Sequence, residues 1–201
     1  MLRANLMVTQ DQRRAATRGA ILKAARAIFG DQGFAATTVD QIAAAAGVAK
    51  GAVYHHFAAK EALFEAVFDA VSGDLVREVG AAAAGANDAL AAMTAGARAY
   101  FAACSEGPTG RIILRDGPAV LGWERWREID RAHFAGRFPA ALAAAMDAGI
   151  VPRQPVEPLG ALLLGAVTEA AMACAASDDV PTAGAAHLRA LETLLEGLRV
   201  R

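Results

Sequence analysis

This 201-residue sequence has few aromatic and cysteine residues, and several features of other protein classes are missing from it. Only 6% of its residues are aromatic, and no long run alternates apolar with polar residues, which argues against a β-sheet protein. No uninterrupted apolar run approaches the ~20 residues of a transmembrane helix, and the N-terminus has no signal-peptide core. We therefore expect a cytoplasmic protein that makes no contact with a membrane.

Known catalytic patterns are also missing from the sequence. It has no Ser/His/Asp set at a recognisable nucleophile elbow, no Gly-rich phosphate loop and no paired-histidine metal helix. Cys104 and Cys174 lack the spacing of a zinc site, and two cysteines form no disulfide framework. We expect two buried thiols, with any redox role left open, and a protein that is not an enzyme and needs no cofactor or metal.

The sequence is rich in helix-forming residues. Its hydrophobic content is 55% and is dominated by alanine, a strong helix former, so we predict an all-α fold of about nine helices. The net charge of −1 hides an asymmetry, because residues 1–60 carry eight Lys or Arg against three acids, and residues 61–201 carry twelve against eighteen. A basic first part (+5) and an acidic remainder (−6) are what phosphate binding by the first part would produce.

Residues 37–60, TTVDQIAAAAGVAKGAVYHHFAAK, contain the parts of a helix-turn-helix in order. Thr38 and Gln41 have the spacing of a capping box at the start of a short helix. Gly47 ends that helix, where a left-handed backbone is favourable only for glycine. A second helix is predicted over residues 50–56, and this geometry places a second helix in a DNA major groove.

The second of these helices has an apolar inner face, since Val53 and Phe57 are four residues apart. Its remaining side chains are available for the outer surface. A lysine there can bind a phosphate or a guanine edge, and small residues let the backbone approach DNA. The adjacent pair His55-His56 points in different directions around the helix and has no i+4 partner, so we do not expect a metal site.

The motif GVAKGAVYHHFAAKEAL, with the upstream ILKAARAIFGDQGFAATTVDQIA, resembles the TetR family of bacterial transcription repressors over about residues 17–68. The resemblance implies an N-terminal three-helix DNA-binding domain (1–59), joined by a long helix to a larger helical ligand-sensing and dimerisation domain (60–201). It also implies a homodimer on a palindromic double-stranded DNA operator. The expected DNA-binding residues are Thr37, Thr38, Lys50, Gly51, Ala52, Tyr54, His55, His56 and Lys60.

Further helices are predicted after the helix-turn-helix. A long helix from about residue 60 to 83 and another over 88–104 have regular apolar stripes. A helix starting at Pro118 is expected to continue with a kink near Pro139. The last two helices have apolar stripes with small residues beside them, and the resemblance implies that they form a four-helix dimer interface.

An apolar cavity for a small-molecule effector is expected in the second domain. The residues most able to line it are Met93, Phe101, Trp123, Trp126, Phe134, Met146, Glu169 and Met172. Glu169 lies on an otherwise apolar helix, where a buried carboxylate needs a partner. The mixed charges of residues 124–131 indicate a solvated helix face.

These observations predict a homodimeric TetR-like repressor that leaves its operator when an unidentified small molecule binds. The alternatives are a ligand-insensitive DNA-binding or architectural protein, and a helical enzyme. The operator sequence, the regulated genes and the choice between repressor and activator are not encoded in these patterns.

Overall fold

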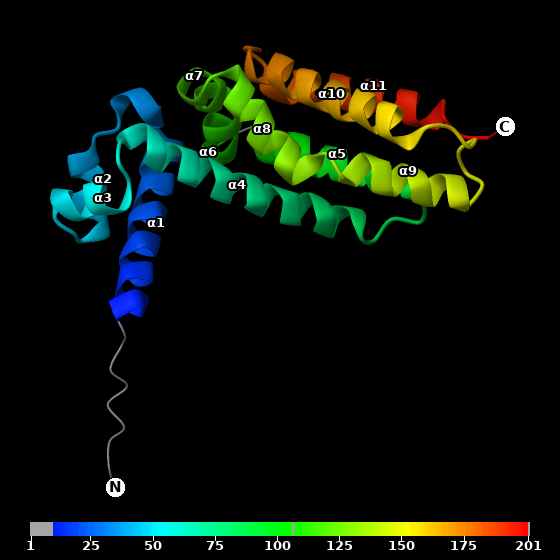
Figure 1. Cartoon of the computed structure of the whole chain (residues 1–201). Helices are drawn as coiled ribbons and strands as arrows, with labels where there is room; N and C mark the ends of the chain where they lie inside the picture. Colours follow the sequence, from blue (N-terminus) through cyan, green and yellow to red (C-terminus); the bar gives the residue numbers. More distant parts are fainter. Residues whose placement is uncertain (1–9, 106, 201) are drawn as a thin grey trace, which may run out of the picture. The chain divides into compact units, whose positions relative to one another are not determined.

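The computed structural model describes residues 10–105 and 107–200, and every regular element in these ranges is helical. The predicted all-α fold is thereby confirmed. A tail over about residues 1–11, which the sequence also predicts, lies largely outside the described residues. The described chain divides between Val67 and Phe68 into two compact units (Figure 1), and the division falls within a long helix.

The smaller unit is built from α1 (Gln10–Ala36), α2 (Val39–Ala46), α3 (Lys50–His56) and the first turns of α4 (Lys60–Ala83). Its core contains three phenylalanine rings, Phe29, Phe34 and Phe64, whose centroids lie 5.2–5.7 Å apart. Gly33 interrupts α1 with a φ of +83°, a backbone angle that glycine adopts without strain.

The helix-turn-helix forms as its sequence predicts. The Thr38 hydroxyl accepts from the Gln41 backbone N–H at 3.2 Å, and the Gln41 side chain accepts from the Thr38 N–H at 2.7 Å, completing the capping box. Gly47 has a φ of +68°, and its N–H and that of Val48 bond back to carbonyls of the last turn of α2. The connection between α2 and α3 is therefore fixed by local hydrogen bonds.

The larger unit contains the rest of α4 and the elements after it. They are α5 (Ala89–Ser105), α6 (Gly107–Gly110), the π-helix η1 (Arg111–Asp116), α7 (Gly117–Leu121), α8 (Trp123–Phe134), α9 (Arg137–Asp147), α10 (Val156–Ala175) and α11 (Val180–Glu196). Within this unit α5 packs against α9, α10 and α11, while α10 packs against α9 and α11.

The predicted single helix from Pro118 is wrong in its continuity, because the structure divides it into α7, α8 and α9. Gly122 has a φ of +77°, which ends α7 before α8 begins. Pro139 lies in the first turn of α9, where its missing N–H costs no helical hydrogen bond, so it produces no kink.

One helix, α10, is long and apolar enough to cross a membrane by length and composition. A single helix of this kind is weak evidence, since core helices of soluble proteins pass the same test. Glu157 and Glu169 interrupt the apolar sequence of this helix.

Candidate DNA-binding surface and ligand cavity

The outer surface of α3 carries the predicted DNA-contacting side chains. Lys50, Tyr54 and His55 are exposed, with 47% of the Tyr54 surface accessible, while Val53 is buried against the unit. A Cβ atom on Gly51 would meet no heavy atom within 4 Å, so the backbone there is open to a large partner. Ala52 is half-buried. The structure thus brings these residues together on one accessible helix face.

Lys50 has an acidic neighbour within the smaller unit. Its Nζ donates to Oδ2 of Asp40 at 2.8 Å, and this hydrogen bond raises the pKa of the lysine. Both side chains are more than half exposed, so the pair adds little to stability. An arriving phosphate can therefore displace Asp40 at small cost.

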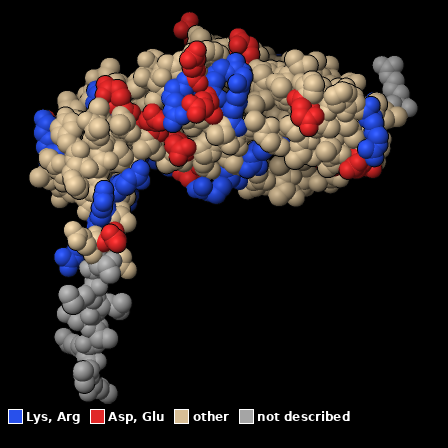
Figure 2. All heavy atoms as spheres, in the orientation of Figure 1, with Lys and Arg blue, Asp and Glu red and all other residues tan. Residues whose placement is uncertain are grey.

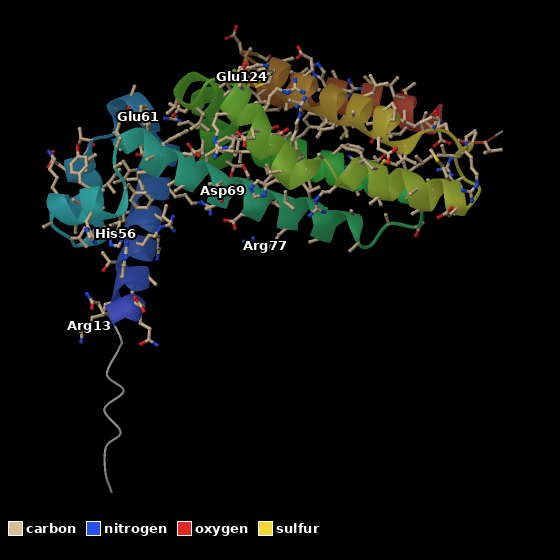
Figure 3. All side chains as sticks on the ribbon, in the orientation of Figure 1. Arg13, His56, Glu61, Asp69, Arg77 and Glu124 are labelled. Atoms are coloured by element: carbon tan, nitrogen blue, oxygen red, sulfur yellow. The ribbon has the colours of Figure 1, made fainter. Side chains whose placement is uncertain are left out.

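His56 lies where α3 meets basic residues of α1. Partial burial, then His55 and the cationic Arg14 and Arg18, lower its pKa. Arg18 also lies over the Phe57 ring at 5.2 Å. Figure 3 shows His56 on α3 and Arg13 near the start of α1. This surface is therefore basic through arginines, while His56 is neutral near pH 7.

The structure gives two of the predicted DNA contacts partners within the protein. Thr37 is only 1% exposed, and its hydroxyl donates to the Gly33 carbonyl at 2.6 Å, which keeps its side chain from the surface. Lys60 donates to the carbonyls of Phe34 and Thr37 at 3.0 and 2.9 Å, and its Nζ lies 4.1 Å from the Phe34 ring centroid. Lys60 therefore ties the start of α4 to the turn after α1, whereas Thr38 remains exposed.

A cavity of about 340 Å³ opens within the larger unit. Its walls come from α4, α5, α8, α9 and α10, and most of its lining is alanine, glycine or another apolar side chain. Three aromatic residues, Tyr100, Phe134 and Phe138, contribute rings to it. Tyr100 and Phe134 meet edge to face, with centroids 5.6 Å apart. The volume is within the usual range of small-molecule sites.

Asp130 is the acidic residue in this lining, and it is 7% exposed. Burial raises the pKa of its carboxyl from 3.8 to about 6, although Arg127, His133 and Arg131 oppose the increase. None of those three side chains forms an ion pair with it; His133 bonds instead to Asp69 of α4 at 2.9 Å. Figure 3 labels Asp69 on that helix. Asp130 is thus a buried carboxyl group without an ion-pair partner in a mostly apolar wall.

Most of the predicted cavity residues lie elsewhere, and only Met93 and Phe134 line the cavity. Trp126 is fully buried and its Nε1 donates to the Ile113 carbonyl of η1 at 2.7 Å, so it is a core residue. Trp123 is 48% exposed and stacks on Trp126 with centroids 5.2 Å apart. Glu169 is exposed, so it needs no buried partner. Phe101 and Met146 are buried and Met172 is half-buried, all outside the lining.

The prediction missed Asp130 because it treated residues 124–131 as a solvated face. Figure 2 shows charges of both signs gathered over α8, and Arg125 and Glu128 pair there at 2.6 Å. Asp130, however, lies four residues after Trp126 and four before Phe134, on the buried stripe of that helix. This i+4 spacing was the signal in the sequence that could have identified it.

Both cysteines are free and buried, as expected. Burial raises the pKa of the Cys104 thiol to about 12, so the thiol stays protonated and is a poor nucleophile.

The arrangement defines a class of protein in which a helix-turn-helix unit is followed by a helical unit with a cavity. Residues 21–67 match the model of the bacterial regulatory proteins of the tetR family, and residues 90–198 match the tetracyclin repressor-like C-terminal domain. The chain belongs to the TetR family of transcriptional regulators.

Similar proteins cover either the helix-turn-helix or the whole chain. The HTH-type transcriptional repressor KstR2 of Mycobacterium tuberculosis is 48% identical to this chain over 48 residues. The match covers 24% of this chain and 24% of KstR2, so this chain spans about a quarter of the length of that curated relative. A TetR-family regulator from Pectobacterium atrosepticum has 30% identity and a TM-score of 0.87, covering 96% of this chain and 98% of its own. SmeT, solved as a triclosan complex, has 27% identity, a TM-score of 0.65 and 92% coverage of both chains.

Proposed function

We propose that this protein is a cytoplasmic, homodimeric repressor that binds a palindromic operator through α3. It leaves the operator when a small molecule occupies the cavity lined by α4, α5, α8, α9 and α10. The exposed face of α3 supports DNA binding, because Lys50, Tyr54 and His55 are accessible there. No heavy atom lies within 4 Å of a Cβ placed on Gly51, so DNA can approach the backbone at that residue. Thr38, Ala52 and His56 complete the proposed contact surface. The proposed functional domains are residues 1–59, which bind DNA, and residues 60–201, which bind the ligand and form the dimer.

The dimer is proposed to form through α10 and α11. Each helix leaves apolar side chains uncovered in the single chain, since Leu162 is 71% and Leu194 57% exposed. A Cβ on Gly165, one turn from Leu162, would meet nothing within 4 Å, so a second helix can approach closely there. Two α3 helices related by a two-fold axis would double the contacts with a symmetric site.

Release is proposed to work through α4. Val79 and Ala83 of this helix line the cavity, and Asp69, also on α4, bonds to His133 of α8. A ligand that favours one position of α4 shifts the protein between DNA-competent and DNA-incompetent states, provided that it binds the second state more tightly. The triclosan complex of SmeT supports a ligand site in a protein of this fold.

The DNA-binding proposal is tested by selecting bound fragments from the source genome and titrating them with variants. Tyr54→Ala and Lys50→Ala are expected to weaken specific binding at least about tenfold, as loss of a base or phosphate contact typically does. Arg77→Ala is the matched control, because it removes an exposed cation on α4 (Figure 3) outside the proposed surface. Parental affinity in both α3 variants would refute the assignment of α3.

The dimer is tested by sedimentation of Leu162→Glu and Leu194→Glu at fixed protomer concentration. Both variants are expected to shift toward monomer, because a carboxylate would be buried at an apolar interface. Ala82→Glu adds the same charge on an exposed position of α4 and should leave the dimer intact. An unchanged dimer in both leucine variants would place the interface elsewhere.

A further inference from the structure

The ligand cavity has a chemical preference that follows from Asp130. No described side chain or backbone group hydrogen-bonds to its carboxylate, although the residue is only 7% exposed. Every fully enclosed side-chain oxygen or nitrogen in the described ranges has a partner, so this unpartnered carboxylate keeps some accessible surface, and Asp130 is one of the residues that line the cavity. A buried carboxylate of this kind is stabilised by any donor that reaches it.

The rest of the lining restricts what can carry that donor. The cavity wall is apolar apart from Asp130, Tyr100, Thr168 and Arg137. Thr168 is 6% exposed and forms no hydrogen bond within the described chain, so its hydroxyl is also available to a ligand. The rings of Tyr100, Phe134 and Phe138 provide faces for an apolar or aromatic body, and for a cation.

Arg137 is the cationic residue of the lining, and its position makes it a poor anion receptor. It is exposed, and its guanidinium lies over Gly80 of α4, 3.1 Å from where a Cβ on that glycine would be. An anion inside the cavity would face Asp130 without a buried cation to balance it. Burying two like charges is costly in an apolar site.

We propose that the cavity selects a compact, mostly apolar molecule whose polar end is a hydrogen-bond donor, a hydroxyl or a protonated amine, and that Asp130 accepts this donor. Molecules of the same shape that end in a carboxylate are rejected. This inference rests on the proposed ligand-binding function and names the class of ligand for that site.

The test uses three probes with one skeleton and different polar ends: 4-phenylbutan-1-ol, 4-phenylbutylamine and 4-phenylbutyrate. Their dissociation constants for the full-length protein without DNA are measured by calorimetry at pH 7.5. The alcohol, the amine or both are expected to bind at least tenfold more tightly than the carboxylate. Comparing the two donors shows whether the site favours a neutral or a cationic head.

Asp130→Asn assigns the preference to this residue. It is expected to reduce the advantage of the amine over the carboxylate at least tenfold, because the amide carries no charge to attract one and repel the other. Asp178→Asn, which removes an exposed carboxylate, should leave all three constants unchanged. Circular dichroism of each variant confirms that the fold is intact.

The outcomes separate the inference from the function on which it rests. Binding of the carboxylate as tightly as the donors, or its loss in Arg137→Gln, overturns the inference while ligand binding stands. An unchanged preference in Asp130→Asn also overturns it. If none of the three probes binds at millimolar concentration, the cavity does not accept compact apolar molecules, and the proposed ligand-binding function fails together with the inference.

Discussion

Replacing Asp130 with asparagine should make the ligand-free protein more stable near neutral pH. The carboxyl is 7% exposed, and burial raises its pKa from 3.8 to about 6. A folded-state pKa above the unfolded value means that the ionised form is disfavoured by folding. The difference between 3.8 and about 6 corresponds to about 3 kcal/mol of unfolding free energy when the group is fully ionised.

The sign of the pH dependence follows from the same linkage. Below pH 3.8 the carboxyl is protonated in both states and the parent loses nothing relative to the variant. Between pH 3.8 and about 6 the parent loses stability progressively, because the unfolded state has released the proton that the folded state still holds, and above about pH 6 the loss is complete. About 2 kcal/mol of the total is expected between pH 4.5 and 8.

The assay is urea denaturation of parent and Asp130→Asn at a series of pH values and one protomer concentration, since a dimer's stability depends on concentration. The quantity of interest is the difference in unfolding free energy between the two proteins, in which the contributions of all groups that they share largely cancel. Asp178→Asn should stay within about 0.5 kcal/mol of the parent throughout, as an exposed substitution does. A difference that does not grow with pH, or a variant less stable at pH 8, would refute the burial of an unpaired charge.

Three further substitutions test local features of the structure. Thr38→Ala should cost about 1 kcal/mol of unfolding free energy by removing the cap of α2, measured by urea denaturation; no loss would refute the capping role. Gly110→Ala would push a Cβ into the backbone carbonyl of Cys104 and should cost about 1–3 kcal/mol of unfolding free energy. Gly85→Ala meets no atom within 4 Å and should be nearly neutral, and equal effects of the two substitutions would contradict the packing of Gly110. Ala141→Phe fills part of the cavity, so in a gel-shift assay the variant should still bind the operator but should no longer be released by the ligand. Normal release would show that the ligand binds outside this cavity.

The helix-turn-helix was predictable because its geometry depends on contacts close in sequence. The Thr38–Gln41 capping box spans three residues, and Gly47 ends α2 through its own backbone angle. The bonds of Lys60 to the carbonyls of Phe34 and Thr37 were not predictable, because they join residues more than twenty positions apart. Sequence periodicity identifies which face a residue occupies, but it does not identify which distant carbonyl that residue meets.

The cavity was less predictable because five helices build it, and residue type alone does not distinguish a wall from a core. Trp126 and Met93 are both large and buried, yet only Met93 lines the cavity. What separates them is the packing around each: the Trp126 ring is enclosed near η1 and bonded to the Ile113 carbonyl, whereas small residues of α5 and α9 leave space beside Met93.

Two carboxylates on helices with apolar stripes show how periodicity decides between burial and exposure. Asp130 shares the i+4 stripe of Trp126 and Phe134 and is buried despite its charged neighbours in sequence. Glu169 has mostly apolar neighbours in sequence but lies seven residues after the exposed Leu162, on the outer face of α10. A helix places residues seven apart on nearly the same face, so the spacing outweighs the composition around each acid. The buried acid lowers the stability of the ligand-free protein, and a donor bound to Asp130 would recover part of that cost, so the same carboxylate links ligand choice to stabilisation by the ligand.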